Sequence, residues 1–205
     1  GRLVRMIKRT DEGRSETRFD ASTGDIDKIF ESYTLPDGNV LTKEKRYLPE
    51  DNALESVIVV DANGNLVRTV LREMKSLSNV FTGQTEYSKD GKASLTVNHW
   101  FDKKTTKLNI REQIQWLPNG ERGVTEHFTF SQDGSLVKYH KCLLHPPTDT
   151  FMEEIHLYDP RSQALLRKEE KTYMRGENQA SVDITIYDTK GNQLERKSAV
   201  EKRLI

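Results

Sequence analysis

Residues 124–143 read VTEHFTFSQDGSLVKYHKCL, and this stretch decides the fold. Apolar and polar residues alternate on both sides of Asp133-Gly134, which is typical of two β-strands that each bury one face. Asp-Gly is a strong hairpin signal because a type I′ turn needs positive φ at both central residues. A two-residue loop there predicts three cross-strand pairs: Phe128 with Tyr139, Phe130 with Val137, and His127 with His140. The stretch therefore predicts an antiparallel hairpin with a coherent apolar face.

The same signal recurs along the chain, at intervals that leave room for one strand but not for a crossover helix. Its clearest copies, as Asp-Gly or the equivalent Asn-Gly, are Asp37-Gly38, Asn63-Gly64, Asp90-Gly91 and Asn119-Gly120, and Lys190-Gly191-Asn192 is a further turn signal. This spacing predicts an all-β fold, a large antiparallel up-and-down meander of more than ten strands, twisted or rolled into an open sheet or half-barrel. No Gly/Ser linker, Pro-rich tract or charge block divides the sequence, so we expect a single β-meander domain over residues 1–205.

Two segments also fit a helix, because apolar residues recur at helical spacing within 25–33 and 66–78. Turn spacing fits strands there as well, so the sequence leaves both alternatives open, and one or two short helices could cover the sheet. Residues 55–60 read ESVIVV and are apolar on both faces, which predicts a central strand. Pairing through Asn63-Gly64 sets Glu55 opposite Arg72 and predicts an ion pair.

The composition excludes several classes of protein. Lys and Arg number 32, as do Asp and Glu, so the net charge of zero gives no field to steer nucleic acid, and we expect no such partner. No run of about 18 apolar residues occurs, which predicts no transmembrane segment. Cys142 is the only cysteine, so a disulfide within the chain is excluded. Common nucleotide-binding, zinc-protease and hydrolase motifs are absent, so we expect neither catalysis nor a cofactor.

One stretch, Tyr187-Asp188-Thr-Lys-Gly191-Asn192-Gln-Leu194, resembles the YD repeat of Rhs-type proteins, whose unit runs Tyr-Asp-x-x-Gly-x-Leu. Val60-Asp61-Ala-Asn-Gly64-Asn65-Leu66 is a second, partial copy. Similar hairpin repeats occur in YwqK-type repeats and in secreted lipoproteins with rolled, porin-like sheets. The resemblance implies an extended β-sheet scaffold without catalytic residues on the repeats. The chain could therefore be a lipoprotein. The compartment stays open, with a secreted or periplasmic location favoured over the cytoplasm.

The histidines are candidate metal ligands. If Phe151, Ile155 and Leu157 continue the apolar face of the hairpin, then Glu154 and His156 share the other face with His127 and His140. Adjacent strands bring such side chains within about 5 Å, so a row of His127, His140 and Glu154 or His156 could bind Zn²⁺ or another divalent cation. The simpler alternative is that these residues are solvated members of a polar face.

A second candidate site would bind an apolar ligand. Trp116 is an even number of residues from Ile110 and Ile114, so it is expected on the same face of their strand, where it could line a groove or pack in the core. We expect six residues to line a half-barrel cavity: Trp116, Ile110, Ile114, Phe128, Phe130 and Tyr139.

The function that the sequence predicts is that of a non-catalytic binding or scaffold module, which engages a protein partner through a sheet face or edge. Oligomers could form through the same edges. A carrier of an apolar small molecule or lipid is the alternative. A metal site on the histidine row is the third hypothesis.

Overall fold

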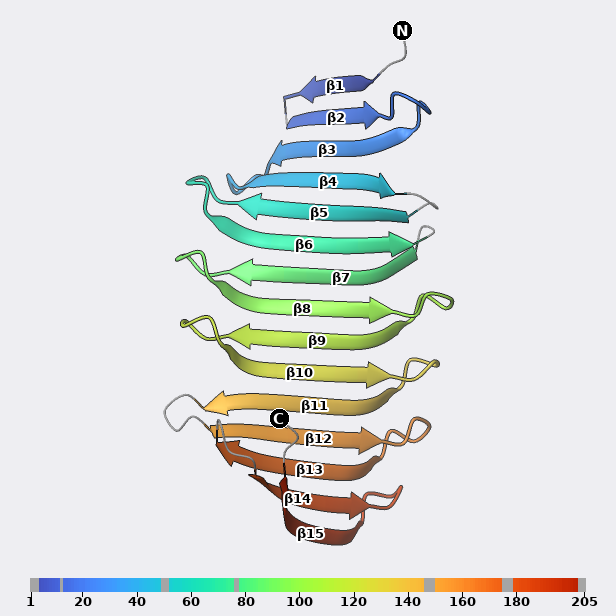
Figure 1. Ribbon diagram of the computed structural model, residues 1–205, viewed down its shortest axis with the longest axis vertical. Coiled ribbons are helices and arrows are strands. Elements are labelled where there is room, and N and C mark those ends of the chain that lie inside the picture. The colour runs from blue at the N-terminus through green and yellow to red at the C-terminus, as the bar shows by residue number, and fades with distance from the viewer. Residues whose placement is uncertain are drawn as a thin grey trace. The chain divides into compact units, whose positions relative to one another are not determined.

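The computed structural model describes residues 4–11, 13–48, 52–75, 78–145, 150–174 and 179–202 (Figure 1). In these ranges, fifteen antiparallel strands follow one another in sequence order within one sheet, and β1 and β15 stand at the two ends of that order. The described residues contain no helix, and hence none long and apolar enough to cross a membrane. The prediction of an all-β up-and-down meander with more than ten strands is confirmed.

The chain divides into two compact units, residues 1–106 and 107–205. The first holds β1 (Arg5–Thr10), β2 (Gly13–Phe19), β3 (Ile26–Thr34), β4 (Val40–Leu48), β5 (Asn52–Val60), β6 (Leu66–Lys75), β7 (Ser78–Tyr87) and β8 (Ala93–Phe101). The second holds β9 (Leu108–Trp116), β10 (Arg122–Phe130), β11 (Leu136–His145), β12 (Thr150–Tyr158), β13 (Leu165–Met174), β14 (Gln179–Tyr187) and β15 (Gln193–Lys202). A single domain over residues 1–205 stays a prediction.

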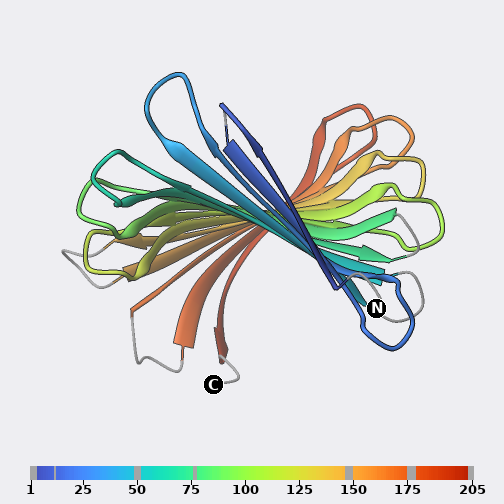
Figure 2. The same cartoon turned by 90° about the horizontal axis from the view of Figure 1, so that it is seen from above.

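Within each unit, neighbouring strands are rotated against one another, so they fan out when seen from above (Figure 2). This rotation is the usual twist of β-sheets, which arises from the chirality of the residues. The sequence left a helix open for the segments 25–33 and 66–78, but residues 26–33 belong to strand β3, residues 66–75 form β6, and Ser78 begins β7. Residues 76 and 77 lie outside the described residues.

The tight turns differ in type from the prediction. In the β5–β6 turn, Gly64 N donates to Asp61 O at 3.0 Å and Asp61 N donates to Asn65 O at 2.9 Å. Gly64 has φ of 83°, whereas Asn63 is not among the described residues with positive φ. This is a type I turn closed by a glycine bulge, not a type I′ turn. The register shifts beside it, between Val59 and Val60.

Aspartate side chains close these turns. Asp61 Oδ1 accepts hydrogen bonds from the backbone of Asn63 and Asn65, both at 2.9 Å. Asp188 accepts the equivalent bonds from Lys190 and Asn192, also at 2.9 Å. The two stretches that resemble YD repeats therefore use their aspartate in the same way. In both, the carboxylate accepts hydrogen bonds from backbone N–H groups of the turn.

The hairpin register holds beyond the turns. Glu55 stands opposite Arg72, as predicted, and Arg72 Nη1 donates to Glu55 Oε1 at 2.6 Å. His127 stands opposite His140, also as predicted. Phe130 pairs with Leu136 instead of Val137, which corrects the sequence prediction, because the glycine bulge inserts a residue beside the turn.

Few side chains are fully buried. Among the described residues the buried apolar ones are Ala53, Val59, Ile114, Leu144, Tyr173, Ala180 and Val182. The one cluster that they form joins Tyr173, Ala180 and Val182, with Phe151 and Ile184 packed against it. Most other strand residues are half-buried on either face, so each strand can present side chains on both sides of the sheet.

Candidate anion-binding site

Four cationic side chains form a row across the first four strands. The register gives three successive cross-strand pairs: Arg5–Arg18, Arg18–Lys28 and Lys28–Arg46. Directly paired residues point to the same side of a sheet, so all four lie on one face, which we call the arginine face. Neighbouring strands lie about 4.8 Å apart, so the row spans roughly 14 Å.

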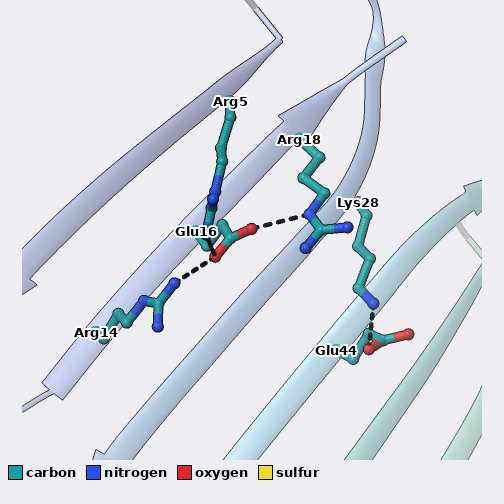
Figure 3. Close-up of polar contacts among 6 residues, drawn as sticks. All are labelled: Arg5, Arg14, Glu16, Arg18, Lys28 and Glu44. Carbon is teal, nitrogen blue, oxygen red and sulfur yellow. Dashed lines mark hydrogen bonds and ion pairs between the residues drawn. The ribbon is translucent and has the colours of Figure 1, made fainter.

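Glu16 lies in the middle of the arginine face and is 5% exposed. Its Oε2 accepts hydrogen bonds from Arg5 Nη2 at 2.8 Å and Arg14 Nη2 at 2.6 Å (Figure 3). Its Oε1 accepts one from Arg18 Nε at 2.8 Å. The hydrogen bonds from Arg5 and Arg18 lower the pKa of Glu16 to about 2. One carboxylate therefore accepts hydrogen bonds from three guanidinium groups.

Glu44 has the same role for the other half of the row. Lys28 Nζ lies 2.5 Å from Glu44 Oε2, and Arg46 Nε lies 2.5 Å from Oε1. The contact with Lys28, followed by that with Arg46, lowers the pKa of Glu44. Phe30 pairs with Glu16 on one side and with Glu44 on the other, so the two carboxylates share the row next to the cations.

The arginine face is hollowed at this place. A cavity of about 340 Å³ is lined by Arg5, Arg14, Arg18, Lys28, Glu16, Glu44 and Phe30. Arg46 adjoins it through Glu44, and these five cations exceed the two carboxylates by three charges. Arg14 Nε is buried without a hydrogen-bond partner among the described residues. The lining offers N–H donors that suit carboxylate or phosphate oxygens.

The predicted histidine pair lies in the second unit. The rings of His127 and His140 are stacked with their centroids 6.0 Å apart. Burial lowers the pKa of His127, although Glu112, whose Oε1 lies 3.3 Å from His127 Nε2, acts in the opposite direction. His140 Nε2 lies 3.7 Å from Glu153 Oε2, and the Tyr173 hydroxyl donates to Glu153 Oε1 at 2.6 Å. These two neighbours lower the pKa of Glu153 to about 2.

The third histidine lies on the opposite face, which corrects the predicted row. His140 pairs with Ile155, and Tyr139 pairs with His156. Glu154 is on the face of His156, and its Oε1 lies 2.9 Å from His156 Nε2. A shift of one residue moves every side chain of a strand to the other face. The same shift places three apolar residues on the face of His127: Phe151, Ile155 and Leu157. In the described ranges no group of three or more His, Cys, Asp or Glu side chains could hold a metal ion.

The residues predicted to line an apolar cavity divide between the two faces of the second unit. Ile110 and Ile114 lie on the face of His127, opposite threonines of β10. Phe128 and Tyr139 pair on the other face, with ring centroids 5.2 Å apart. Trp116 pairs with Arg122, whose guanidinium lies 5.8 Å from the indole centroid, and Phe130 ends β10 beside the turn. The six residues therefore share no common face, and an apolar carrier stays a prediction.

The sequence reasoning missed the cation row. A two-residue loop at Asp37-Gly38, the kind of loop that correctly pairs His127 with His140, would set Lys28 opposite Tyr47, whereas the structure sets Lys28 opposite Arg46. The turn sequences of the first four strands therefore do not predict the register that forms the row. Charged residues on a strand are usually solvated, and the balanced total charge concealed their arrangement on one face.

Comparison with known proteins adds no assignment: no protein-family model matches the sequence, and no curated protein matches it.

Proposed function

We propose that this chain is a non-catalytic binding module whose arginine face engages acidic side chains of a protein partner. The observation that carries the proposal is the unbroken row of Arg5, Arg18, Lys28 and Arg46. Like charges directly opposite one another on neighbouring strands are destabilising. A sequence selected for folding alone would alternate the charges along such a row, so an arrangement that breaks this rule points to a ligand of opposite charge.

An acidic protein segment fits the face better than a nucleic acid does. Glu16 and Glu44 interrupt the positive surface, and the turns add Asp20 and Asp25 at one end of the strands and Asp37 at the other. A nucleic-acid backbone carries a charge about every 3.4 Å per strand, so a chain crossing the face would meet these carboxylates. A short acidic segment can present its carboxylates to the cations alone.

Fluorescence anisotropy with a labelled octaglutamate peptide tests this function. We expect saturable binding that weakens as salt rises, because exposed charges are screened beyond about 10 Å at 0.1 M ionic strength. Arg18→Glu should weaken binding at least about tenfold, since charged hydrogen bonds are lost and a repulsive charge is added. The matched control is Lys89→Glu, the same reversal of charge in an exposed turn outside the row, which should leave the affinity within about twofold.

Three results would overturn the proposal. The first is no binding of octaglutamate at low salt, and the second is equal binding by the Arg18→Glu and Lys89→Glu variants. The third is tighter binding of a single-stranded oligonucleotide of the same length, which would make the face a nucleic-acid site. Circular dichroism of each variant confirms that the strands remain folded.

A further inference from the structure

We propose that the acidic segment of the partner binds as an added antiparallel strand on the outer edge of β1. This inference rests on the proposed function and specifies how the partner is held. Peptides commonly extend exposed sheet edges in this way, because main-chain hydrogen bonds supply affinity and alternate side chains supply specificity.

Strand β1 has the features of a receptive edge. It stands at one end of the strand order, and within the described residues it pairs with β2 alone (Figure 1). All six of its residues are exposed. An edge strand carries a line of unpaired N–H and C=O groups along its outer side. These groups lie directly beside the arginine face, since Arg5 belongs to both β1 and the cation row.

The side chains of β1 specify the sequence that would pair with it. Arg5, Ile7 and Arg9 point to the arginine face, because they pair with Arg18, Glu16 and Arg14. Met6 and Lys8 point to the other face. Cross-strand pairs favour opposite charges and matched apolar groups. The partner strand should therefore carry acids opposite Arg5, Lys8 and Arg9, and apolar residues opposite Met6 and Ile7.

A carboxylate opposite Arg5 would also neutralise part of the excess positive charge on the arginine face. The added strand would lie about 4.8 Å beyond β1, so its acid would become the next position of the row Arg46–Lys28–Arg18–Arg5. A second acid opposite Arg9 would lie beside the cross-strand pair Arg9–Arg14, the other pair of opposed arginines on this face.

A second copy of this chain fits the edge poorly. Strand β1 contains three cations, Arg5, Lys8 and Arg9, and no acid, so two β1 edges paired with each other would gather six positive charges. Charged edges are a common device against such self-association. The same three residues that discourage a second β1 attract an acidic strand, so they provide discrimination as well as affinity.

The test uses the full chain and three peptides that share one sequence, Thr-Glu-Glu-Val-Val-Glu-Thr, which places its acids opposite Arg9, Lys8 and Arg5. One peptide is unmodified, and the other two carry backbone N-methyl groups on alternate residues, in the two opposite phases. In an added strand the N–H groups of only one phase point toward β1, so one methylated peptide loses its hydrogen bonds to the sheet and the other is the matched control. Anisotropy measures affinity, and hydrogen exchange of the β1 amides reports pairing.

We expect the unmodified peptide and one methylated peptide to bind alike, the other to bind at least about tenfold more weakly, and the β1 amides to become protected. Equal binding of both methylated peptides, or no protection of β1, overturns strand addition. If octaglutamate still binds in that case, the proposed function stands without it. If neither octaglutamate nor the unmodified peptide binds, both proposals fail.

Discussion

Arg5 and Arg18 stand directly opposite each other on β1 and β2, and both donate to the same carboxylate, that of Glu16. The pairing of two cations is unfavourable by itself, and Glu16 makes it tolerable because its two oxygens divide the two guanidinium groups between them. The local stability of β1 and β2 therefore depends on one acid. An acidic ligand at this face would compete with Glu16 for the same donors.

Glu16→Gln should lower the melting temperature and raise the affinity for octaglutamate. The amide cannot neutralise Arg5, Arg14 and Arg18, so their mutual repulsion destabilises the fold, and the same loss leaves more positive charge for the ligand. Stability and function often oppose each other in this manner at binding sites. Thermal unfolding and anisotropy measure the two effects.

The control for Glu16→Gln is Glu31→Gln, which removes an acid from β3 on the side of the sheet opposite the arginine face. It should leave the affinity for octaglutamate unchanged within about twofold. A Glu16→Gln variant that binds more weakly than the parent would show that Glu16 helps to hold the ligand, contrary to the competition described above.

The stability of the second unit should fall on mild acidification because of His127. Burial lowers the pKa of this imidazole below its ordinary value of 6.5, so the unfolded chain takes up the proton at a higher pH than the folded chain. The contribution of neutral His127 is therefore complete above 6.5 and is lost as the pH falls through that value toward the folded pKa.

NMR titration of the His127 ring protons should give a midpoint below 6.5, and His127→Gln should reduce the drop in melting temperature between pH 7.5 and 5.5. A midpoint above 6.5 would show that the carboxylate of Glu112 outweighs burial at this position. That outcome would reverse the sign of the pH dependence.

The sequence predicts the hairpins better than their connections. Glu55 with Arg72 and His127 with His140 were predictable because a short glycine turn fixes the register on both of its sides. Between β11 and β12 the sequence has no glycine turn of this kind, and the prediction placed His156 on the wrong face of the sheet. A shift of one residue moves every side chain of a strand to the other face. Side-chain parity is therefore predictable within a tight hairpin and uncertain across a longer connection.

The helical spacing in residues 25–33 has a physical explanation as well. Ile29 and Tyr33 lie on one face of β3 and Phe30 lies on the other, and all three are half-buried. A strand that places apolar residues on both faces breaks the two-residue alternation and imitates a helical repeat. Periodicity alone cannot separate the two structures in such a segment.

The glycine bulges should be sensitive to substitution. Gly64 has φ of 83°, and a Cβ there would meet no atom within 4 Å, so the cost of Gly64→Ala comes from backbone conformation alone. We expect a loss of about 1 kcal/mol in the free energy of unfolding. Gly64→Asn should lose less, because asparagine tolerates left-handed backbone better than alanine does. Equal losses for the two variants in urea unfolding would show that the position is not held in this conformation.

The small apolar cluster of the second unit gives the sharpest stability contrast. Val182 on β14 is 1% exposed and belongs to the cluster with Tyr173 and Ala180, whereas Val200 on the neighbouring strand β15 is 69% exposed. Val182→Ala removes two buried carbons and leaves a cavity, so the free energy of unfolding should fall by about 2 kcal/mol. Val200→Ala makes the same chemical change at an exposed site and should cost less than about 0.5 kcal/mol. Urea unfolding of both variants measures the difference, and equal losses would mean that Val200 is covered in solution by another surface.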